Sequence, residues 1–153
     1  MHGIDEIDKQ LIRLIRKNNK LTAEELSNKV ALSISAIQRR IKRFRDEKII
    51  VSDIAVISKE AMGKAVSCII EVSLHFGESK VIDKFKKQMT ALPEVLHCYY
   101  VTGNIDFFIL ISLTDMHAYE AFSRKYFMDN PDVKQFSTHV LIDTVKFEHG
   151  ILP

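Results

Sequence analysis

The sequence lacks several features that would direct it to particular classes of protein. It contains no tryptophan, three prolines and two cysteines. Cys68 and Cys98 lie far apart without C-x-x-C spacing, so no metal or redox motif is indicated and we expect reduced, buried thiols. No apolar run approaches the roughly 20 residues of a membrane-spanning helix. The start of the chain also lacks the basic and apolar regions of a signal peptide. These absences predict a cytoplasmic protein without metal, cofactor or membrane partner.

The composition is that of a folded chain with an uneven distribution of charge. Hydrophobic residues make up 46% of the 153 residues, and the net charge is only +2, which argues against disorder. Residues 1–60 contain thirteen lysines and arginines against nine acids, whereas residues 61–153 contain nine against eleven. A basic first part and a slightly acidic second part indicate two modules with different partners.

The most basic stretch, residues 32–45, has the periodicity of an amphipathic helix. Ile37, Ile41 and Phe44 form one narrow apolar stripe, at positions i, i+4 and i+7. The other side is polar and basic: Ser35, Gln38, Arg39, Lys42 and Arg43. Small side chains near the start, with Gln and Arg beyond them, suit a helix in the DNA major groove. The alternative is a basic helix that merely faces solvent.

The neighbouring segments favour a helix-turn-helix. Asp5–Lys17 has helical periodicity, and Thr22 with Glu25 forms a capping box that opens a short second helix. Ala31 stands in the link to the basic helix, where a positive φ would cost on the order of 1 kcal/mol. The β-branched segment 49–57 predicts a short hairpin or wing.

The second part alternates between strand and helix periodicity. Its predicted elements are a strand over 65–76, a helix over 78–92, strands over 95–101 and 107–113, a helix capped by Asp115, and a strand over 134–147. This β-α-β-β-α-β order predicts a ferredoxin-like domain, with two helices on one face of an antiparallel sheet. Ile69, together with either the row of Phe107, Ile109 and Ile111 or the row of Phe108 and Leu110, gives both faces of the sheet apolar members. We therefore expect self-association through the open face.

The predicted fold class is therefore α+β, a winged helix-turn-helix followed by a ferredoxin-like βαββαβ domain. We expect the DNA-binding domain with its short β wing or linker at residues 1–60. The ferredoxin-like domain, which we expect to oligomerise, is expected at residues 61–153.

Five ordered patterns support a family resemblance. They are Asp5-x-x-Asp8-x-x-Leu11, Leu21-Thr22-x-x-Glu25-Leu26-Ser27, Val30-x-Leu32-Ser33-x-Ser35, Arg39-Arg40-Ile41-Lys42-Arg43-Phe44 and Val101-Thr102-Gly103-Asn104-Ile105-Asp106. Along nearly the whole chain the sequence resembles the Lrp/AsnC, or feast/famine, transcription regulators. The resemblance implies double-stranded DNA as a partner, and a homodimer that assembles further, to an octamer. It also implies an amino-acid effector held between subunits, which makes residues 61–153 the effector-binding and oligomerisation domain.

Two sets of candidate site residues follow. The candidate DNA-binding residues are Ser33, Ser35, Ala36, Gln38, Arg39, Arg40, Lys42 and Arg43. For Arg40, a phosphate contact and a bond within the domain remain open. The candidate effector-binding residues are Thr102, Gly103, Asn104, Ile105, Asp106 and Thr138. Amide groups at the glycine turn can hold a carboxylate, and Asp106 either holds the α-ammonium group or orders its own turn.

Two other functions remain as alternatives. An architectural DNA-binding protein without an effector would share the basic helix. Tetrapyrrole decarboxylases have a similar fold, and His97 and His139 on predicted strands could meet in a pocket. The sequence has no H-E-x-x-H, G-x-S-x-G or P-loop motif, so we assign no catalytic residue and expect no enzyme.

Overall fold

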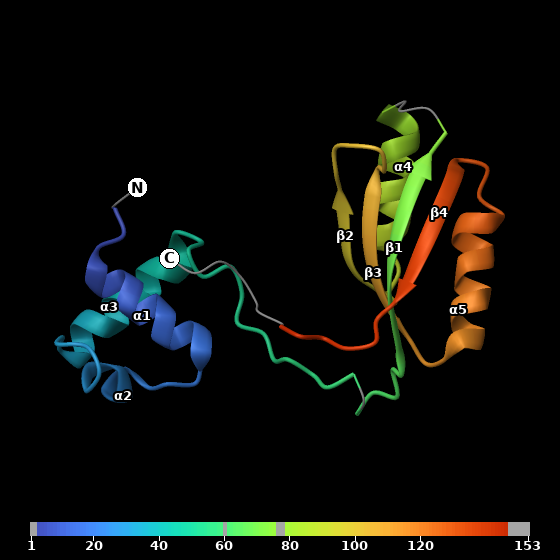
Figure 1. Cartoon of the computed structure of the whole chain (residues 1–153). Coiled ribbons are helices and arrows are strands. Elements are labelled where there is room, and N and C mark those ends of the chain that lie inside the picture. Colours follow the sequence, from blue (N-terminus) through green and yellow to red (C-terminus); the bar gives the residue numbers. More distant parts are fainter. Residues whose placement is uncertain (1–2, 60, 76–78, 147–153) are drawn as a thin grey trace. The chain divides into compact units, whose positions relative to one another are not determined.

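The computed structural model describes residues 3–59, 61–75 and 79–146. The chain divides into two compact units, coloured along the sequence in Figure 1. The first unit contains the described residues up to Val56, and the second begins at Ile57. Among the described helices, none has the length and apolar character needed to cross a membrane.

The first unit consists of three short helices, α1 (Glu6–Lys17), α2 (Ala23–Ser27) and α3 (Ile34–Asp46). Leu11, Leu26, Ile37 and Phe44 have no exposed surface and form the centre of the unit. Each helix buries one apolar face against the other two, because none is long enough to be stable alone. The predicted helix-turn-helix is therefore confirmed.

Side-chain caps define where these helices begin. The Asp5 carboxylate accepts from the backbone N–H of Asp8 at 2.7 Å, and the Asp8 carboxylate accepts from that of Asp5 at 3.1 Å. Thr22 and Glu25 make the predicted capping box, at 3.1 and 2.7 Å. Such caps satisfy backbone N–H groups that the first helical turn leaves unpaired.

The expected hairpin or wing of the first unit is not formed. Segment 49–57 forms no strand, although the structure describes every residue of it. A strand needs a hydrogen-bonded neighbour strand, but the backbone hydrogen bond that the segment makes within the described residues, from the Ile50 N–H to the Phe44 carbonyl at 2.9 Å, goes back to α3. Among the described non-glycine residues only Lys48 has a positive φ, at 58°, so Ala31 carries no such strain.

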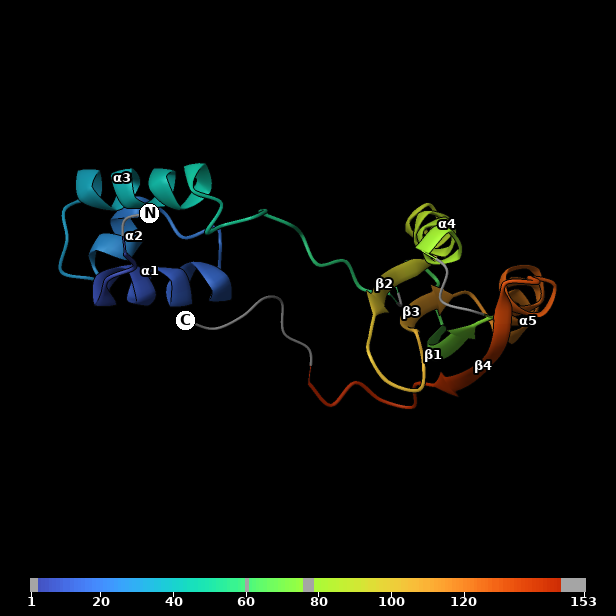
Figure 2. The ribbon, with the colours of Figure 1, turned by 90° about the horizontal axis from the view of Figure 1, so that it is seen from above.

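The second unit has the predicted ferredoxin-like topology. Its elements are β1 (Val66–Leu74), α4 (Ser79–Thr90), β2 (Val95–Tyr100), β3 (Phe107–Leu113), α5 (Met116–Ser123), the π-helical segment η1 (Arg124–Met128) and β4 (Val133–Val140). The sheet order is β2-β3-β1-β4, and all neighbouring strands are antiparallel. Figure 2 shows α4 and α5 on the same side of this sheet.

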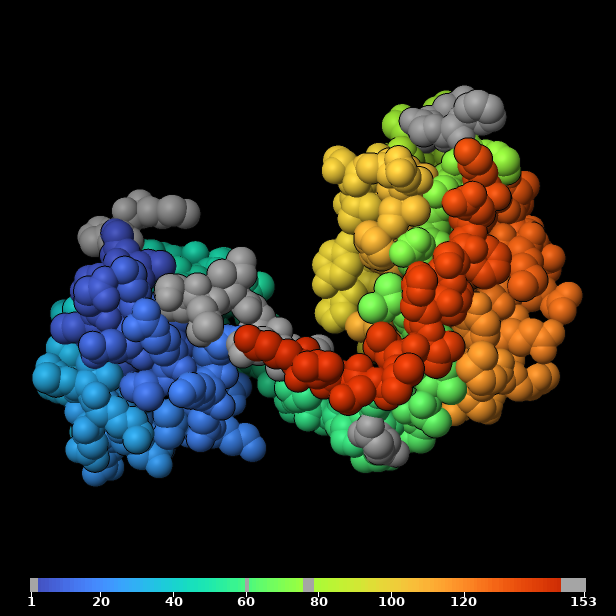
Figure 3. Space-filling view, in the orientation of Figure 1, coloured from blue at the N-terminus to red at the C-terminus, as the bar shows by residue number. Residues whose placement is uncertain are grey.

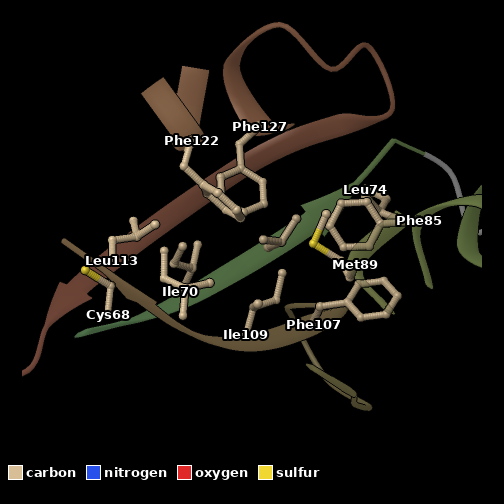
Figure 4. Close-up of a cluster of buried hydrophobic side chains, with 12 residues drawn as sticks. Cys68, Ile70, Leu74, Phe85, Met89, Phe107, Ile109, Leu113, Phe122 and Phe127 are labelled. Atoms are coloured by element: carbon tan, nitrogen blue, oxygen red, sulfur yellow. The ribbon is translucent and has the colours of Figure 1, made fainter. Parts of the chain in front are cut away.

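The core of the second unit lies between the sheet and the two helices (Figure 4). Phe85 and Met89 come from α4, Phe122 comes from α5 and Phe127 comes from η1. The inward positions of β1 alternate as predicted, with Ile70 fully buried. Burial also raises the pKa of the Cys68 thiol, in keeping with an unreactive free cysteine.

The last strand is shorter than the sequence suggested. We expected it over 134–147, but β4 ends at Val140 and residues 141–146 form no strand. Its neighbour β1 begins at Val66, and the Leu141 N–H makes the final bond to the Ser67 carbonyl at 2.8 Å. Beyond that point β4 has no partner backbone on β1. Phe147, like Phe76 and Glu78 of the predicted elements, lies outside the described residues.

Candidate DNA-binding surface and effector region

The outward face of α3 carries exposed polar and basic side chains. Ser35, Gln38, Arg39 and Lys42 are all exposed. Within the described residues, Arg39 makes no hydrogen bond or ion pair. Lys42 pairs with Asp46 at 2.7 Å, and this hydrogen bond raises the pKa of Lys42. Both members of that pair are largely solvated, so it restrains the lysine only weakly. This face is accessible to a ligand with phosphate charges.

A second pair of arginines on α3 points toward α1 instead. Arg40 Nη1 lies 2.5 Å from Asp8 Oδ1 and 2.7 Å from Asp5 Oδ2. Arg43 Nη2 lies 2.5 Å from Asp8 Oδ2. The Asp8 side chain has no exposed surface, whereas those of Arg40 and Arg43 are 22% and 27% exposed. Of the two possibilities for Arg40, the structure therefore contains the bond within the domain.

These ion pairs decide the charge states of the cluster. Burial alone would raise the pKa of Asp8, but hydrogen bonds from Arg40, the Asp5 backbone and Arg43 together hold it below its usual value. The pKa of Asp5 is lowered by the backbone hydrogen bond from Asp8 and by Arg40. The hydrogen bonds that Arg40 donates to Asp5 and Asp8 raise the pKa of Arg40. The cluster therefore keeps its charges at neutral pH.

Asp8 joins α1 to α3, a role that was not among those predicted from the sequence. A signal was available, because Asp8 lies four residues after Ile4 and three before Leu11, on the apolar side of α1. A carboxylate at such a position needs cationic partners when it is buried. Which cations these are could not be read from the spacing.

The remaining candidate DNA-binding residues lie at the start of α3. Ser33 is its N-cap, and the Ser33 hydroxyl accepts from the Ala36 N–H at 3.3 Å. The hydroxyls of Ser33 and Ser35 are 3.2 Å apart. Ala36 is half-buried. Ser33 therefore has a structural role in the cap, whether or not it also contacts DNA.

The predicted effector turn is attached to the end of β1. Asp106 Oδ2 accepts from the Leu74 N–H at 2.8 Å, and the Asp106 N–H donates to the Val72 carbonyl at 2.9 Å. The Ser73 hydroxyl donates to the Asn104 carbonyl at 3.3 Å. Gly103 has φ of 125°, which favours glycine. Thr102 and Gly103 are exposed, and Ile105 is half-buried.

Thr138 lies on β4, on the side of the sheet that the helices cover. It stands opposite Ile70 of β1, and its hydroxyl accepts from the Tyr119 hydroxyl of α5 at 2.7 Å. Val72, the β1 residue that binds Asp106, stands opposite Phe136. The turn and Thr138 therefore contact neighbouring positions of β1, and no hydrogen bond joins them within the described residues.

The two histidines proposed for an enzymatic pocket do not meet. His97, Leu110, Ile69 and His139 form one row across the sheet, with His97 on one edge strand and His139 on the other. Two strands separate them, which corresponds to about 14 Å at the usual interstrand spacing. His139 Nε2 instead lies 3.3 Å from Glu71 Oε1. The alternative in which His97 and His139 share a pocket within one sheet is therefore contradicted.

The open face of the sheet includes half-buried apolar side chains, Ile69, Phe108 and Leu110, beside Tyr99, which is 57% exposed. In Figure 3 the green atoms of β1 are visible between the yellow and red strands, uncovered by helices of the same unit. This surface has the apolar character that self-association through the open face requires.

A small helical unit with an exposed basic third helix, followed by a ferredoxin-like unit, defines the class of two-domain DNA-binding regulators. Models of known families agree with both halves. A winged helix-turn-helix DNA-binding domain matches residues 4–51, and the Lrp/AsnC ligand binding domain matches residues 67–151. The chain belongs to the Lrp/AsnC family of transcriptional regulators.

Individual relatives support this assignment. The chain is 42% identical, over 94% of its length and 85% of the relative, to an uncharacterized HTH-type transcriptional regulator, y4tD, of Sinorhizobium fredii. It is 27% identical to the leucine-responsive regulatory protein of Haemophilus influenzae, over 94% of this chain and 87% of that one. A transcriptional regulator of Neisseria meningitidis, NMB0573, crystallised with L-Met, shares 27% identity and a TM-score of 0.92, covering 97% of this chain and 96% of that chain.

Proposed function

We propose that this protein is a sequence-specific DNA-binding regulator, not an enzyme, and that an amino acid changes its assembly and its affinity for DNA. The observation that carries the proposal is the exposed face of α3, where Arg39 has no partner within the described residues. The family model for the second unit describes a ligand-binding domain, which supports the effector part.

The DNA-contacting surface in this proposal comprises the outward side of α3. Arg39 and Gln38 have the reach and the hydrogen-bonding groups to contact base edges in the major groove. Lys42 supplies a cation for phosphate, because its bond to Asp46 is solvated and can exchange. Ser35 is short enough to allow close approach of the backbone near the start of the helix.

The effector site in this proposal uses the turn from Thr102 to Asp106, with Thr138 as a further contact. The exposed N–H groups of Gly103 and Asn104 donate no hydrogen bond within the described residues, so they are available to a carboxylate. Asp106 uses Oδ2 for Leu74, and Oδ1 remains available to an ammonium group. The Neisseria relative bound to L-Met supports an amino acid as the ligand.

The mechanism follows from assembly. A homodimer places two α3 helices on half-sites spaced by helical turns of DNA, and further assembly, to an octamer, adds avidity. An amino acid bound between subunits shifts the equilibrium between assemblies only by its difference in affinity for them. The change in DNA affinity therefore depends on how the assemblies space the helices.

The test is sedimentation of the full chain with a duplex selected from a random pool by this protein, repeated with each common amino acid. We expect at least one amino acid to change the size of the complex or the fraction of DNA bound. DNA binding without any response would support an architectural role and contradict the effector part. Absence of DNA binding, with tetrapyrrole absorbance in the purified protein, would contradict the whole proposal.

A further inference from the structure

Asp8 is a buried carboxylate that binds two arginines of α3, the helix proposed to contact DNA. Its Oδ1 accepts from Arg40 and its Oδ2 from Arg43, each at 2.5 Å. Oδ2 also accepts from the Asp5 N–H at 3.1 Å. Because the Asp8 side chain has no exposed surface, these three hydrogen bonds replace the water contacts that the carboxylate has in the unfolded chain.

We propose that Asp8 is a positioning residue that holds Arg40 and Arg43 against α1 and withholds both from DNA phosphates. This inference rests on the proposed DNA-binding role of α3. Holding these two arginines limits the non-specific affinity of the protein for DNA. Each cation that reaches a phosphate raises affinity for every DNA sequence equally and does not help to distinguish one sequence from another.

The geometry of α3 separates its cations into two groups. Positions 40 and 43 lie one turn apart on the flank that faces Asp8, as their contacts show. Arg39 lies on the exposed face and has no partner within the described residues. Arg39 and Arg43 therefore have the same charge and lie on the same helix, but only Arg43 is held by a buried acid.

The ion pairs of Asp8 resist exchange with phosphate. If one guanidinium turned away to a DNA phosphate, the Asp8 carboxylate would remain buried with fewer partners. A buried charge that lacks partners is strongly unfavourable. Arg40 has an additional bond to Asp5 at 2.7 Å. A solvated pair such as Lys42 with Asp46 has no comparable penalty, so Lys42 can turn to DNA while Arg40 and Arg43 do not.

The first experiment compares Arg43→Gln with Arg39→Gln in the full chain. Binding to a random-sequence duplex is measured across a range of salt concentrations. On a random-sequence duplex Arg39 has no matching base to recognise, and its exposed guanidinium can pair with a phosphate instead. We therefore expect Arg39→Gln to reduce the magnitude of the slope of log affinity against log salt by about 0.9 for each bound subunit, the value for one lost phosphate contact. Arg43→Gln should leave the slope unchanged. An equal reduction by both variants would overturn the inference while leaving the proposed function intact.

The second experiment removes the restraint with Asp8→Asn. Released guanidinium groups should steepen the salt slope by about 1 to 2 for each bound subunit. Discrimination between the selected duplex and the random duplex should fall at least tenfold. A folded Asp8→Asn protein with an unchanged or shallower slope would overturn the inference. Circular dichroism melting establishes whether the variant folds, and if it does not, the two arginine variants decide.

The two proposals fail in different ways. If the wild-type protein binds neither duplex, the proposed function is wrong. If the wild-type protein binds DNA and Arg39→Gln weakens the salt dependence, the proposed DNA-binding role of α3 is supported. The salt dependence of Arg43→Gln then tests only the proposed role of Asp8.

Discussion

The carboxylate of Asp106 accepts a hydrogen bond from the backbone N–H of Leu74 at 2.8 Å. This bond falls where the register of β1 against β4 shifts, between Ser73 and Leu74. It therefore fixes the turn from Thr102 to Asp106 to an irregular point of the sheet. Since the bond uses one carboxylate oxygen, the structural role of Asp106 and its proposed ligand-binding role can be separated by mutation.

Asp106→Ala should lower the free energy of unfolding by about 1–3 kcal/mol, because the buried Leu74 loses the acceptor of its N–H. Asp106→Asn keeps an acceptor oxygen and should stay within about 1 kcal/mol of wild type. It should nevertheless lose binding of the amino acid found by sedimentation. Urea unfolding and calorimetric titration measure the two effects. Wild-type ligand affinity in Asp106→Asn would contradict the ammonium contact.

Gly103→Ala should destabilise the protein through its backbone alone. A Cβ at Gly103 would have no heavy atom within 4 Å, but its φ of 125° is unfavourable for alanine. We expect a loss of about 1–3 kcal/mol in urea unfolding. Gly3→Ala is the matched control, since its Cβ also meets nothing within 4 Å and its φ is ordinary. Equal stability of the two variants would contradict this explanation.

Arg39→Ala should weaken binding to the selected duplex by about 1–3 kcal/mol while the proposed dimer remains intact. The loss arises from one charge-assisted contact on the exposed face of α3. Arg124→Ala is the control, because it removes an exposed cation of the second unit that pairs only with Glu120 among the described residues. Fluorescence anisotropy measures affinity. Unchanged affinity of Arg39→Ala at physiological salt would refute the assignment.

The stability of the first unit should fall in acid. The pKa values of Asp5 and Asp8 are lower in the folded protein than in the unfolded chain. Each carboxylate therefore stabilises the fold above its ordinary pKa, about 3.9, and this contribution is lost as pH falls through the folded pKa. Thermal melting between pH 2 and 6 should show the decline.

Asp8→Asn provides the comparison for the acid experiment. It lacks one of the carboxylates whose pKa is lowered in the folded protein, so its melting temperature should depend less on pH below about pH 4. If the melting temperature fell with pH equally in Asp8→Asn and in the wild type, Asp8 would not be responsible for the loss of stability in acid.

Local patterns were sufficient for most of the fold. The capping box of Thr22 and Glu25 formed as predicted because its two partners are three residues apart. The alternation through β1 identified its buried side, since the period of a strand does not depend on its partners. Segment 49–57 shows the limit of this reasoning. Its residues favour a strand, but no neighbouring backbone is present in the described structure.

The sequence by itself determined the helices of the first unit, the order of elements in the second and the basic character of α3. These depend on periodicity, capping and charge within a few residues. The tertiary structure decided which arginines of α3 are available. Asp8 meets Arg40 and Arg43 across 32 and 35 residues of chain. Such pairs depend on how α1 packs against α3, and spacing along the sequence carries no information about that geometry.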